Sequence, residues 1–282
     1  MQEATQHRLL TWGLAQLRDL PWRRTRDPWA VLVSEVMLQQ TQVDRVIPRW
    51  LEFLDVYPTA PTCASAPLGD VLRLWQGLGY PRRARNLHAA AQMIESLERF
   101  PRTLPGLMAL PGVGAYTARA IIAFAFEGEA AVVDTNIARV LARVAGERLT
   151  AKEVQERADA ALPGEQAWSW NQCLMDLGAV LCRPLSPRCS ECPLRLDCAW
   201  HGVGDDPAIG SAAVSARQSR FEGSDRQGRG RLMKELGVGE VPCADLADVM
   251  GWPGQHARAE RVAASLVADG LAMVDACGYR LP

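Results

Sequence analysis

Apolar residues recur every three or four positions through most of the first 200 residues, which is the spacing of one face of an α-helix. Prolines and glycines interrupt this pattern and mark the ends of the apolar stretches. The pattern predicts helices over residues 6–18, 28–40, 43–57, 68–78, 84–100, 105–110, 117–126, 134–144, 151–161 and 167–182. Because alternating strand patterns are scarce, we expect an all-α fold for this part of the chain.

A change of composition follows Trp200. Residues 201–224 are rich in glycine, alanine, serine and aspartate and are expected to form a linker. Beyond it, the pattern predicts helices over 225–236, 244–250 and 255–269 and a short hairpin over 272–281. This order is typical of a winged-helix-like module. Two interpretations stay open, contact with nucleic acid and simple packing against the rest of the chain, because the module carries 7 basic and 8 acidic residues.

Charge and composition narrow the class of protein. The net charge of the chain is −1, so any DNA contact has to come from a local patch and from backbone amides. No apolar run reaches the roughly 18–20 residues of a membrane span, and the N-terminus lacks the pattern of a secretion signal. We therefore expect a cytoplasmic protein without a membrane partner. In that reducing compartment, eight cysteines indicate metal or redox chemistry rather than disulfides.

Four of the cysteines form the pattern C-x6-C-x2-C-x5-C, namely Cys182, Cys189, Cys192 and Cys198. Spacers of two to six residues let a loop double back and present four thiolates to one iron–sulfur cluster. Four thiolates also suit zinc, but zinc ribbons usually contain two close cysteine pairs separated by a longer stretch. Here only one such pair exists within 17 residues, so the spacing favours a [4Fe-4S] cluster.

A second feature is the turn Leu110-Pro111-Gly112-Val113-Gly114, which leads into the predicted helix over 117–126. Its glycines permit unusual backbone conformations and expose amides at a helix N-terminus, where a DNA phosphate is a suitable guest. A plain packing corner is the alternative. Asp134 then opens another predicted helix, where an aspartate is also a good N-cap. Asp134 can be an N-cap and a functional carboxylate at once, because an N-capping carboxylate stays ionised near helix N–H groups.

The hairpin, the aspartate at a helix start and the four cysteines, in this order, resemble the helix–hairpin–helix DNA glycosylase superfamily. The adenine-specific mismatch glycosylases (MutY) are the most similar family, and endonuclease III is a cousin. The resemblance covers roughly residues 20–200. It is most specific in three stretches, Ser34-Glu35-Val36-Met37-Leu38-Gln39-Gln40-Thr41-Gln42-Val43, Leu74-Trp75-Gln76-Gly77-Leu78-Gly79-Tyr80 and Arg83-Ala84-Arg85-Asn86-Leu87.

The resemblance implies two helical domains flanking a cleft. Residues 22–132 would form a six-helix barrel with the hairpin, and residues 1–21 with 133–200 would form the iron–sulfur domain. The linker over 201–224 and the winged-helix-like module over 225–282 would follow. The partner would be double-stranded DNA containing a mispair, bound by a monomer associated with the nucleoid.

The resemblance also implies the chemistry. Breaking an N-glycosidic bond builds positive charge on the sugar and needs a proton on the leaving base, so two carboxyl groups in opposite protonation states serve it. Glu35 would be the general acid at adenine N7, because burial in the apolar run around it favours the protonated form. Asp134 would stabilise the cation or attack it transiently. Asn136 and Tyr116 match positions that orient this carboxylate and the water.

Tyr116 bears on the reaction type. A lysine at that position could form a Schiff base and go on to cut the strand, whereas tyrosine cannot. We therefore expect a monofunctional glycosylase that leaves an abasic site.

Several further residues match positions that contact DNA. By resemblance, Gln40 and Tyr80 wedge into the duplex, and Trp22 and Arg23 line the adenine pocket. Thr41 and Leu78 match neighbours that contact either the opposite guanine or the surroundings of the hairpin, and Gly79 belongs to the same DNA-binding set. The amides of Gly112, Val113 and Gly114 would hold the backbone. Plain core packing is the alternative for the apolar members of this set. Candidate phosphate partners are Arg82, Arg83, Arg85, Arg183, Arg188 and Arg195, and a solvated helix start is an equal alternative for the run over 82–85.

The resemblance ends before the C-terminal module, since family members usually carry a larger domain that recognises 8-oxoguanine. The leading hypothesis is an adenine glycosylase at mispairs with guanine or 8-oxoguanine. A thymine or uracil glycosylase at G·T and G·U mispairs is the second hypothesis. A non-catalytic iron–sulfur DNA-binding protein is the third, and the presence of both Glu35 and Asp134 argues against it.

Overall fold

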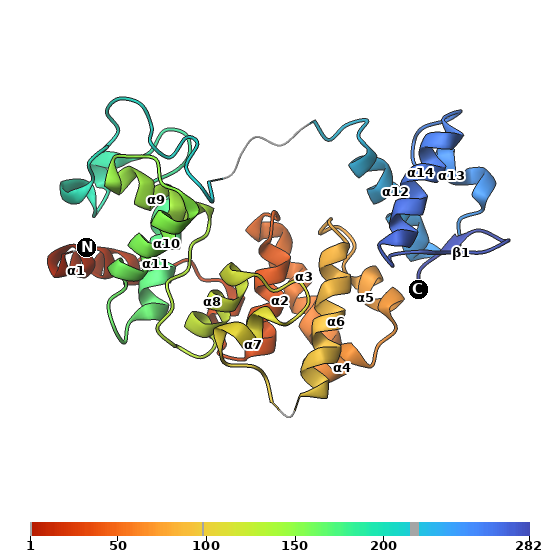
Figure 1. The fold of residues 1–282 in the computed structure, drawn as a ribbon, viewed down its shortest axis with the longest axis horizontal. Coiled ribbons are helices and arrows are strands. Elements are labelled where there is room, and N and C mark those ends of the chain that lie inside the picture. Colours follow the sequence, from red (N-terminus) through yellow and green to blue (C-terminus); the bar gives the residue numbers. More distant parts are fainter. Residues whose placement is uncertain (1, 98, 215–219) are drawn as a thin grey trace. The chain divides into compact units, whose positions relative to one another are not determined.

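The computed structural model describes residues 2–97, 99–214 and 220–282 and is 58% helical with two short strands, which confirms the predicted all-α class (Figure 1). Residue 1, residue 98 in the predicted helix over 84–100, and residues 215–219 in the predicted linker lie outside the described residues. Among the helices that are described, none combines the length and the apolar character needed to cross a bilayer.

The described chain falls into two compact units. Unit 1 contains residues 2–31, 102–108 and 113–214, and unit 2 contains residues 32–97, 99–101, 109–112 and 220–282. The boundaries of these units differ from those of the domains inferred from the resemblance. The domain assignment therefore remains a prediction. Helix α2 (Pro28–Leu38) contributes residues to both units.

Unit 1 is built around α11, against which both α1 and α9 pack. The elements of this unit are α1 (Glu3–Leu14), η1 (Pro21–Arg24), α7 (Leu104–Met108), α8 (Ala115–Phe124), α9 (Thr135–Ala145), α10 (Ala151–Ala161), α11 (Ala167–Val180), η2 (Cys189–Glu191) and η3 (Arg195–Asp197). Its core includes Leu9 from α1, Ile137 from α9 and Trp170 from α11, each at most 1% exposed. A Cβ on Gly13 would lie 2.3 Å from the Cys173 sulfur, so α1 can approach α11 this closely only with glycine there.

The local sequence explains the ends of the unit 1 helices. Asp134 caps the N-terminus of α9, and Gly146 ends the same helix with a left-handed φ of 74° that glycine adopts readily. Thr150 and Glu153 form a reciprocal capping box at the start of α10. The helices therefore begin and end where capping residues satisfy the otherwise unpaired backbone groups.

Unit 2 combines two groups of helices. The elements are α3 (Val43–Val56), α4 (Ala60–Ala64), α5 (Leu68–Leu74), α6 (Arg82–Ser96), α12 (Asp225–Val238), η4 (Cys243–Asp245), α13 (Leu246–Val249), α14 (His256–Ala268), β1 (Met273–Val274) and β2 (Tyr279–Arg280). The core around α3 and α5 contains edge-to-face contacts of Phe53 with Tyr57 and Trp75, with ring centroids 5.2 and 6.2 Å apart.

The C-terminal residues contain the predicted order of three helices and a hairpin. Helices α12, α13 and α14 pack together, and β1 pairs antiparallel with β2. Val241 adds a third short pairing through two backbone hydrogen bonds with Tyr279, of 2.8 and 2.9 Å. A Cβ on Gly228 would lie 2.1 Å from the Trp252 ring, so this glycine lets α12 pack directly on Trp252.

Some predicted boundaries shift, for identifiable reasons. The helix predicted over 68–78 ends at Leu74, because Gly77 and Gly79 adopt positive φ angles of 89° and 73°. The helix predicted over 6–18 runs instead from Glu3 to Leu14. Helix α4 was not predicted, although Thr59 caps it with a capping box and a proline stands in its first turn.

Candidate active site

The Asp134 carboxylate in unit 1 is held by three hydrogen bonds. Its Oδ1 accepts from the backbone amides of Asn136 and Ile137 at 2.9 and 2.7 Å, and its Oδ2 accepts from Asn136 Nδ2 at 2.8 Å. The carboxylate is half-buried at the N-terminus of α9. A carboxylate fixed in this way keeps one orientation while it faces a reacting group.

The extended segment before Asp134 is fixed by one side chain. Asn171 of α11 is 1% exposed, accepts from the Val132 amide at 2.9 Å and donates to the Ala130 carbonyl at 2.9 Å. Because the Asn171 side chain both accepts from and donates to this segment, α11 fixes the position of the segment that leads into α9.

A chain of hydrogen bonds continues from Asp134 into the cysteine loop. Asn136 Oδ1 accepts from Arg139 Nη2 at 2.8 Å, and Arg139 also donates to the carbonyls of Gly178 and Cys182 at 2.8 and 2.7 Å. Arg139 is 4% exposed. The orientation of Asn136, and through it of Asp134, is therefore tied to the backbone of the first cysteine of the loop.

Burial raises the pKa of Asp134 above the ordinary aspartate value, although the hydrogen bonds from Ile137 and Asn136 and the charge of Arg139 oppose this effect. The hydrogen bonds thus offset only part of the cost of holding a charged carboxylate in this place.

Gly178 of α11 is a residue that sequence reasoning missed. A Cβ there would lie 2.5 Å from Asn136 Cβ and 3.0 Å from its Cα, which is closer than real contacts allow. The glycine therefore lets α11 reach the residue that orients Asp134. Its position one helix turn before Cys182 gives no signal of this contact in the sequence alone.

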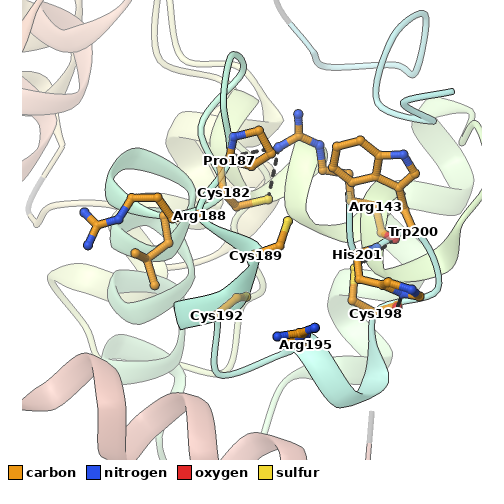
Figure 2. A pocket seen from close by; sticks show the side chains of 11 residues that line it. Arg143, Cys182, Pro187, Arg188, Cys189, Cys192, Arg195, Cys198, Trp200 and His201 are labelled. Carbon is orange, nitrogen blue, oxygen red and sulfur yellow. Dashed lines mark hydrogen bonds between the residues drawn. The ribbon is translucent and has the colours of Figure 1, made fainter. Parts of the chain in front are cut away.

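The four cysteines of the predicted cluster line one pocket (Figure 2). They come from the end of α11 and from the loop containing η2 and η3, and each is partly buried. Two backbone or side-chain N–H groups point at sulfur, since Arg143 Nη1 donates to Cys182 Sγ and the His201 amide donates to Cys198 Sγ, both at 3.3 Å. Such donors are suited to thiolates that carry negative charge.

Arg143 organises the wall of this pocket. It is 1% exposed, forms an ion pair with Asp206 at 2.6 Å, and donates to the Arg183 carbonyl at 2.8 Å. Its guanidinium also lies over the Trp200 ring, 4.6 Å from the centroid (Figure 2). These contacts join α9 to the start of the cysteine pattern and to the chain that follows it.

Four thiolates suit a single zinc ion as well as an iron–sulfur cluster. A single tetrahedral zinc would hold four sulfurs about 3.8 Å apart, given its 2.3 Å bonds. Among the described residues, the cysteines form no set of three whose sulfurs lie within 4.8 Å of one another. The four thiols around one pocket are a donor set that fits an iron–sulfur cluster.

The segment η1 carries Trp22 and Arg23. Trp22 is 8% exposed. Arg23 makes a bidentate ion pair with Asp176 of α11, with both bonds at 2.8 Å, and Arg18 shares the same carboxylate. Burial acts against the charge of Asp176, but the hydrogen bonds from Arg23 and Arg18 outweigh it and hold its pKa below the usual range. The observed role of Arg23 is thus to anchor η1 on α11.

The predicted hairpin has the expected backbone. Gly112 adopts a φ of 78°, and its missing Cβ leaves room for Asn86, which would otherwise lie 2.8 Å away. Gly114 is exposed and stands at the N-cap of α8, whereas the Val113 side chain is buried. Tyr116 lies in the first turn of α8 and is half-buried.

Glu35 lies in unit 2, on the part of α2 between Val33 and Met37. It is 5% exposed, whereas both of those neighbours are fully buried. The predicted burial of this carboxyl group is therefore present.

Two turns of unit 2 carry the residues predicted to wedge into DNA. Gln40 follows α2 and Tyr80 precedes α6, and both adopt left-handed φ angles, of 55° and 47°. Such angles are uncommon for residues other than glycine and recur at functional sites. Thr41 Oγ1 is 3.4 Å from the Leu78 carbonyl and joins the two turns. Leu78 is buried, and Gly79 and Tyr80 are exposed.

Arg83 holds these two turns together. It is 9% exposed, and its Nη1 donates to the carbonyls of residues 36, 37 and 39 at 2.6–2.9 Å. Its Nη2 donates to Thr41 Oγ1 and to the carbonyls of Leu78 and Gly79 at 2.9–3.1 Å. The expectation that Arg83 contacts phosphate is wrong, because a buried guanidinium with these partners is not presented to solvent.

The other candidate phosphate partners are in part paired. Arg82 forms an ion pair with Asp269, and Arg85 donates to the carbonyl of the same residue. On the cysteine loop, Arg188 pairs with Glu191.

Comparison with known proteins identifies the family. Residues 33–163 match the family described as "HhH-GPD superfamily base excision DNA repair protein". Over 270 residues, the chain is 40% identical to an adenine DNA glycosylase of Mycolicibacterium smegmatis, and the alignment covers 93% of this chain and 90% of that protein. The chain belongs to the adenine DNA glycosylase family.

Solved structures agree with this membership at the level of the superfamily. A thermostable thymine-DNA glycosylase is 31% identical with a TM-score of 0.66, covering 70% of this chain and 94% of that one. A non-covalent endonuclease III–DNA complex is 26% identical with a TM-score of 0.62, covering 71% and 97%. This adenine DNA glycosylase family member therefore shares its fold with other DNA base-excising enzymes.

Proposed function

We propose that this enzyme hydrolyses the N-glycosidic bond of adenine mispaired with guanine or 8-oxoguanine in DNA. The observation that carries the proposal is the Asp134 carboxylate, fixed by two helix amides and by Asn136. A carboxylate in one fixed orientation can stabilise the positive charge that develops on the sugar as the bond to the base breaks.

Glu35 supplies the proton in this proposal. Its burial within an apolar helix suits an acid that has to carry a proton to a base before the base leaves. It protonates the ring nitrogen N7, and the base departs neutral. Water then adds to the sugar, and the product is an abasic site.

Tyr116 limits the reaction to this one step. Its phenol provides no amine for a Schiff base with the sugar, so the strand stays intact after the base leaves. Asn136 orients Asp134, and Tyr116 helps to position the attacking water.

The DNA-binding residues follow from the same proposal. Gln40 and Tyr80 enter the base stack, with Thr41, Leu78 and Gly79 around them, and their left-handed backbone presents the side chains outward. The amides of Gly112, Val113 and Gly114 bind a phosphate at the start of α8. Trp22 contributes to the adenine pocket, and Arg23 keeps η1 in place beside it. A monomer acts on double-stranded DNA, and its location with the nucleoid in the cytoplasm stays a prediction.

Cys182, Cys189, Cys192 and Cys198 hold a [4Fe-4S] cluster in this proposal. The N–H donors on two of the sulfurs and the pocket that the four cysteines share support it. With a cluster bound, these four cysteines would hold the loop after α11 in place, and Arg139 would link that loop to Asn136.

The test uses end-labelled duplexes with A·8-oxoguanine, A·G, G·T and G·U pairs, incubated with the enzyme and split into samples with and without alkali. Cleavage after alkali at the adenine of the first two duplexes is expected. Cleavage confined to G·T or G·U would favour the thymine glycosylase function, for which the likeness to a thymine-DNA glycosylase structure is the specific observation. Strand breaks before alkali would contradict the monofunctional reaction.

A further inference from the structure

The arginine that follows η1 folds its side chain back on this short helix. Arg26 Nη1 donates to the carbonyls of Arg23 and Thr25 at 3.2 and 3.1 Å. These carbonyls lie at the C-terminal end of η1, where backbone acceptors lack partners within the helix itself. Arg26 therefore closes the end of the element that carries Trp22.

The same guanidinium has two further partners in unit 1. Its Nε donates to the Glu127 carboxylate at 2.7 Å, and its Cζ lies 4.6 Å from the centroid of the Trp168 ring. Glu127 follows α8, and Trp168 lies in the first turn of α11. Because the side chains of Arg26 and Glu127 are 40% and 60% exposed, their ion pair alone contributes little. The aromatic ring and the two carbonyls therefore fix the guanidinium, and Glu127 adds to them.

The turn that supplies Glu127 is tightly built. Glu127 adopts a left-handed φ of 51°, which is uncommon for a residue other than glycine and persists only where its surroundings hold it. A Cβ on the next residue, Gly128, would lie 2.8 Å from Ile122 Cγ2, and the Gly128 amide donates to the Ile122 carbonyl at 2.9 Å. The close return of the chain onto α8 thus places the Glu127 carboxylate within reach of Arg26.

Helix α11 holds the segment from Arg23 to Arg26 at both ends. Trp168, Gln172 and Asp176 recur every four residues and lie along one face of the helix. Asp176 binds Arg23 and Trp168 binds Arg26, at points about 12 Å apart along the helix axis at a rise of 1.5 Å per residue. Gln172, between these points, is 4% exposed. The segment therefore runs along this face of α11.

We propose that Arg26 is a positioning residue for the adenine pocket and that, with Trp168 and Glu127, it sets the orientation in which η1 presents Trp22 to the extruded base. The inference rests on the proposed function, in which Trp22 lines that pocket. A base that leaves the duplex has to meet the proton donor in a defined orientation, and a misplacement of 1 Å can cost about 100-fold in rate. A contact that fixes the pocket wall therefore acts on the rate without touching the base.

Single-turnover kinetics of the full-length enzyme on an A·8-oxoguanine duplex, at increasing enzyme concentration, test this proposal. Arg26→Gln should lower the maximum rate by roughly 2- to 30-fold, the range for loss of one cation–π contact. Arg24→Gln is the matched control, because it removes the same charge from the same element, and the pair of Arg24 with Asp19 is about 70% exposed on both sides. Both variants should reach half of their maximum rate at the same enzyme concentration. A maximum rate for Arg26→Gln equal to that of Arg24→Gln would overturn the proposal.

Two substitutions of Trp168 separate the cation–π contact from plain packing. Trp168→Phe keeps an aromatic face for the guanidinium and should retain most of the rate. Trp168→Leu keeps an apolar side chain without that face and should reproduce the loss seen in Arg26→Gln. Equal rates for the phenylalanine and leucine variants would contradict the assigned contact. The midpoint of urea unfolding verifies that each variant is folded.

A double-mutant cycle shows whether Arg26 acts through Trp22. In a Trp22→Ala enzyme, Arg26→Gln should cost less than about twofold in further rate, because the ring that it positions is gone. A loss as large as in the wild-type background would overturn the proposal.

Hydrogen exchange separates this inference from the proposed function and needs neither cleavage nor the Trp22 variant. Exchange over residues 22–26 should increase in Arg26→Gln and stay at the wild-type level in Arg24→Gln. Equal exchange in the two variants would show that Arg26 does not hold η1. Failure of wild type to release any base from the duplex, with exchange changed as expected, would instead refute the proposed function.

Discussion

At the residue scale, the two carboxyl groups of the proposed reaction are held in different ways. Glu35 is surrounded by apolar neighbours on α2, whereas Asp134 accepts hydrogen bonds from α9 on both oxygens. The first environment suits a group that gives up a proton, and the second suits a group that stays charged. Each role therefore follows from what surrounds the side chain rather than from its residue type.

The raised pKa of Asp134 predicts a dependence of stability on pH. Its folded pKa lies above the unfolded value of about 3.9, so the folded state retains the proton over a wider range of pH. The stability of wild type relative to Asp134→Asn should be greatest below that unfolded value and should decline as pH rises through the folded pKa. Urea unfolding at a series of pH values measures this difference. A relative stability that increases with pH would contradict it.

The raised pKa of Asp134 also predicts that activity is lost at low pH. If the ionised carboxylate stabilises the cation, the single-turnover rate should fall as pH drops through the folded pKa, at a higher pH than an ordinary aspartate would give. Rates measured with an A·8-oxoguanine duplex test this. A rate independent of pH down to pH 4 would argue against an ionised Asp134 in the reaction.

Breaking the ion pair that anchors η1 should lower the stability of the protein strongly. Asp176→Asn leaves the guanidinium of Arg23, only 7% exposed, without its charge partner, which should cost about 3–5 kcal/mol. Asp19→Asn is the control, because its pair with Arg24 is about 70% exposed on both sides, and its loss should change the free energy of unfolding little. Denaturant unfolding at neutral pH compares them. Similar losses for both variants would contradict the proposed anchoring.

The contacts of Arg83 predict that stability is coupled to the order of the two turns proposed to enter DNA. Arg83→Lys keeps the charge but cannot reach all six acceptors, and leaving buried carbonyls unsatisfied should cost at least about 2 kcal/mol. Hydrogen exchange should increase at residues 78–80. Arg49→Lys, in an exposed pair with Glu52, should change neither quantity. Unchanged exchange in the Arg83 variant would show that the turns are held by other contacts.

At the element scale, the close approach of α11 to α9 positions Asp134, the aspartate of the proposed mechanism. Gly178→Ala places a methyl group against Asn136, so the helices have to separate and the hydrogen bond to Asp134 should weaken. We expect a loss of at least roughly tenfold in single-turnover rate, equivalent to about 1.4 kcal/mol of barrier. Gly164→Ala in the same unit is the control, since its Cβ would meet only a Glu129 oxygen at 3.6 Å.

Most of the helices could be predicted from the sequence. Apolar periodicity identified α9, α10 and α11, and Asp134 also marked the start of α9 as an N-cap. The short helix α4 and the early end of α5 were not predicted, since one turn of helix has almost no periodicity and positive φ at Gly77 depends on the turn that it forms.

The candidate site was only partly accessible in the same way. The cysteine spacing and the aspartate at a helix start are local patterns, and both reappear in the structure as a shared pocket and an N-cap. The partners of Arg83, Arg139 and Gly178 lie tens of residues away along the chain. No pattern in one sequence specifies which carbonyls a buried arginine will meet, so these positioning contacts emerge only from the packing.

At the scale of the whole molecule, the net charge is −1, and the features proposed to act on DNA lie in a few segments of the chain. One unit contributes the capped aspartate and the cysteine pocket, and the other contributes the buried glutamate and the strained turns. The C-terminal module belongs to the second unit through contacts with α5 and α6. Affinity for DNA therefore has to come from local contacts rather than from the charge of the whole chain.

The most direct measurement is the identity of the free base released from an A·8-oxoguanine duplex, determined by mass spectrometry for wild type, Glu35→Gln and Asp134→Asn. The proposed mechanism predicts free adenine and an uncut abasic strand with wild type, and a loss of roughly 100-fold or more in rate for each variant. Release of adenine by either variant at the wild-type rate would contradict the assigned chemistry. Release of thymine or uracil from G·T or G·U duplexes, with no adenine from this one, would contradict the function itself.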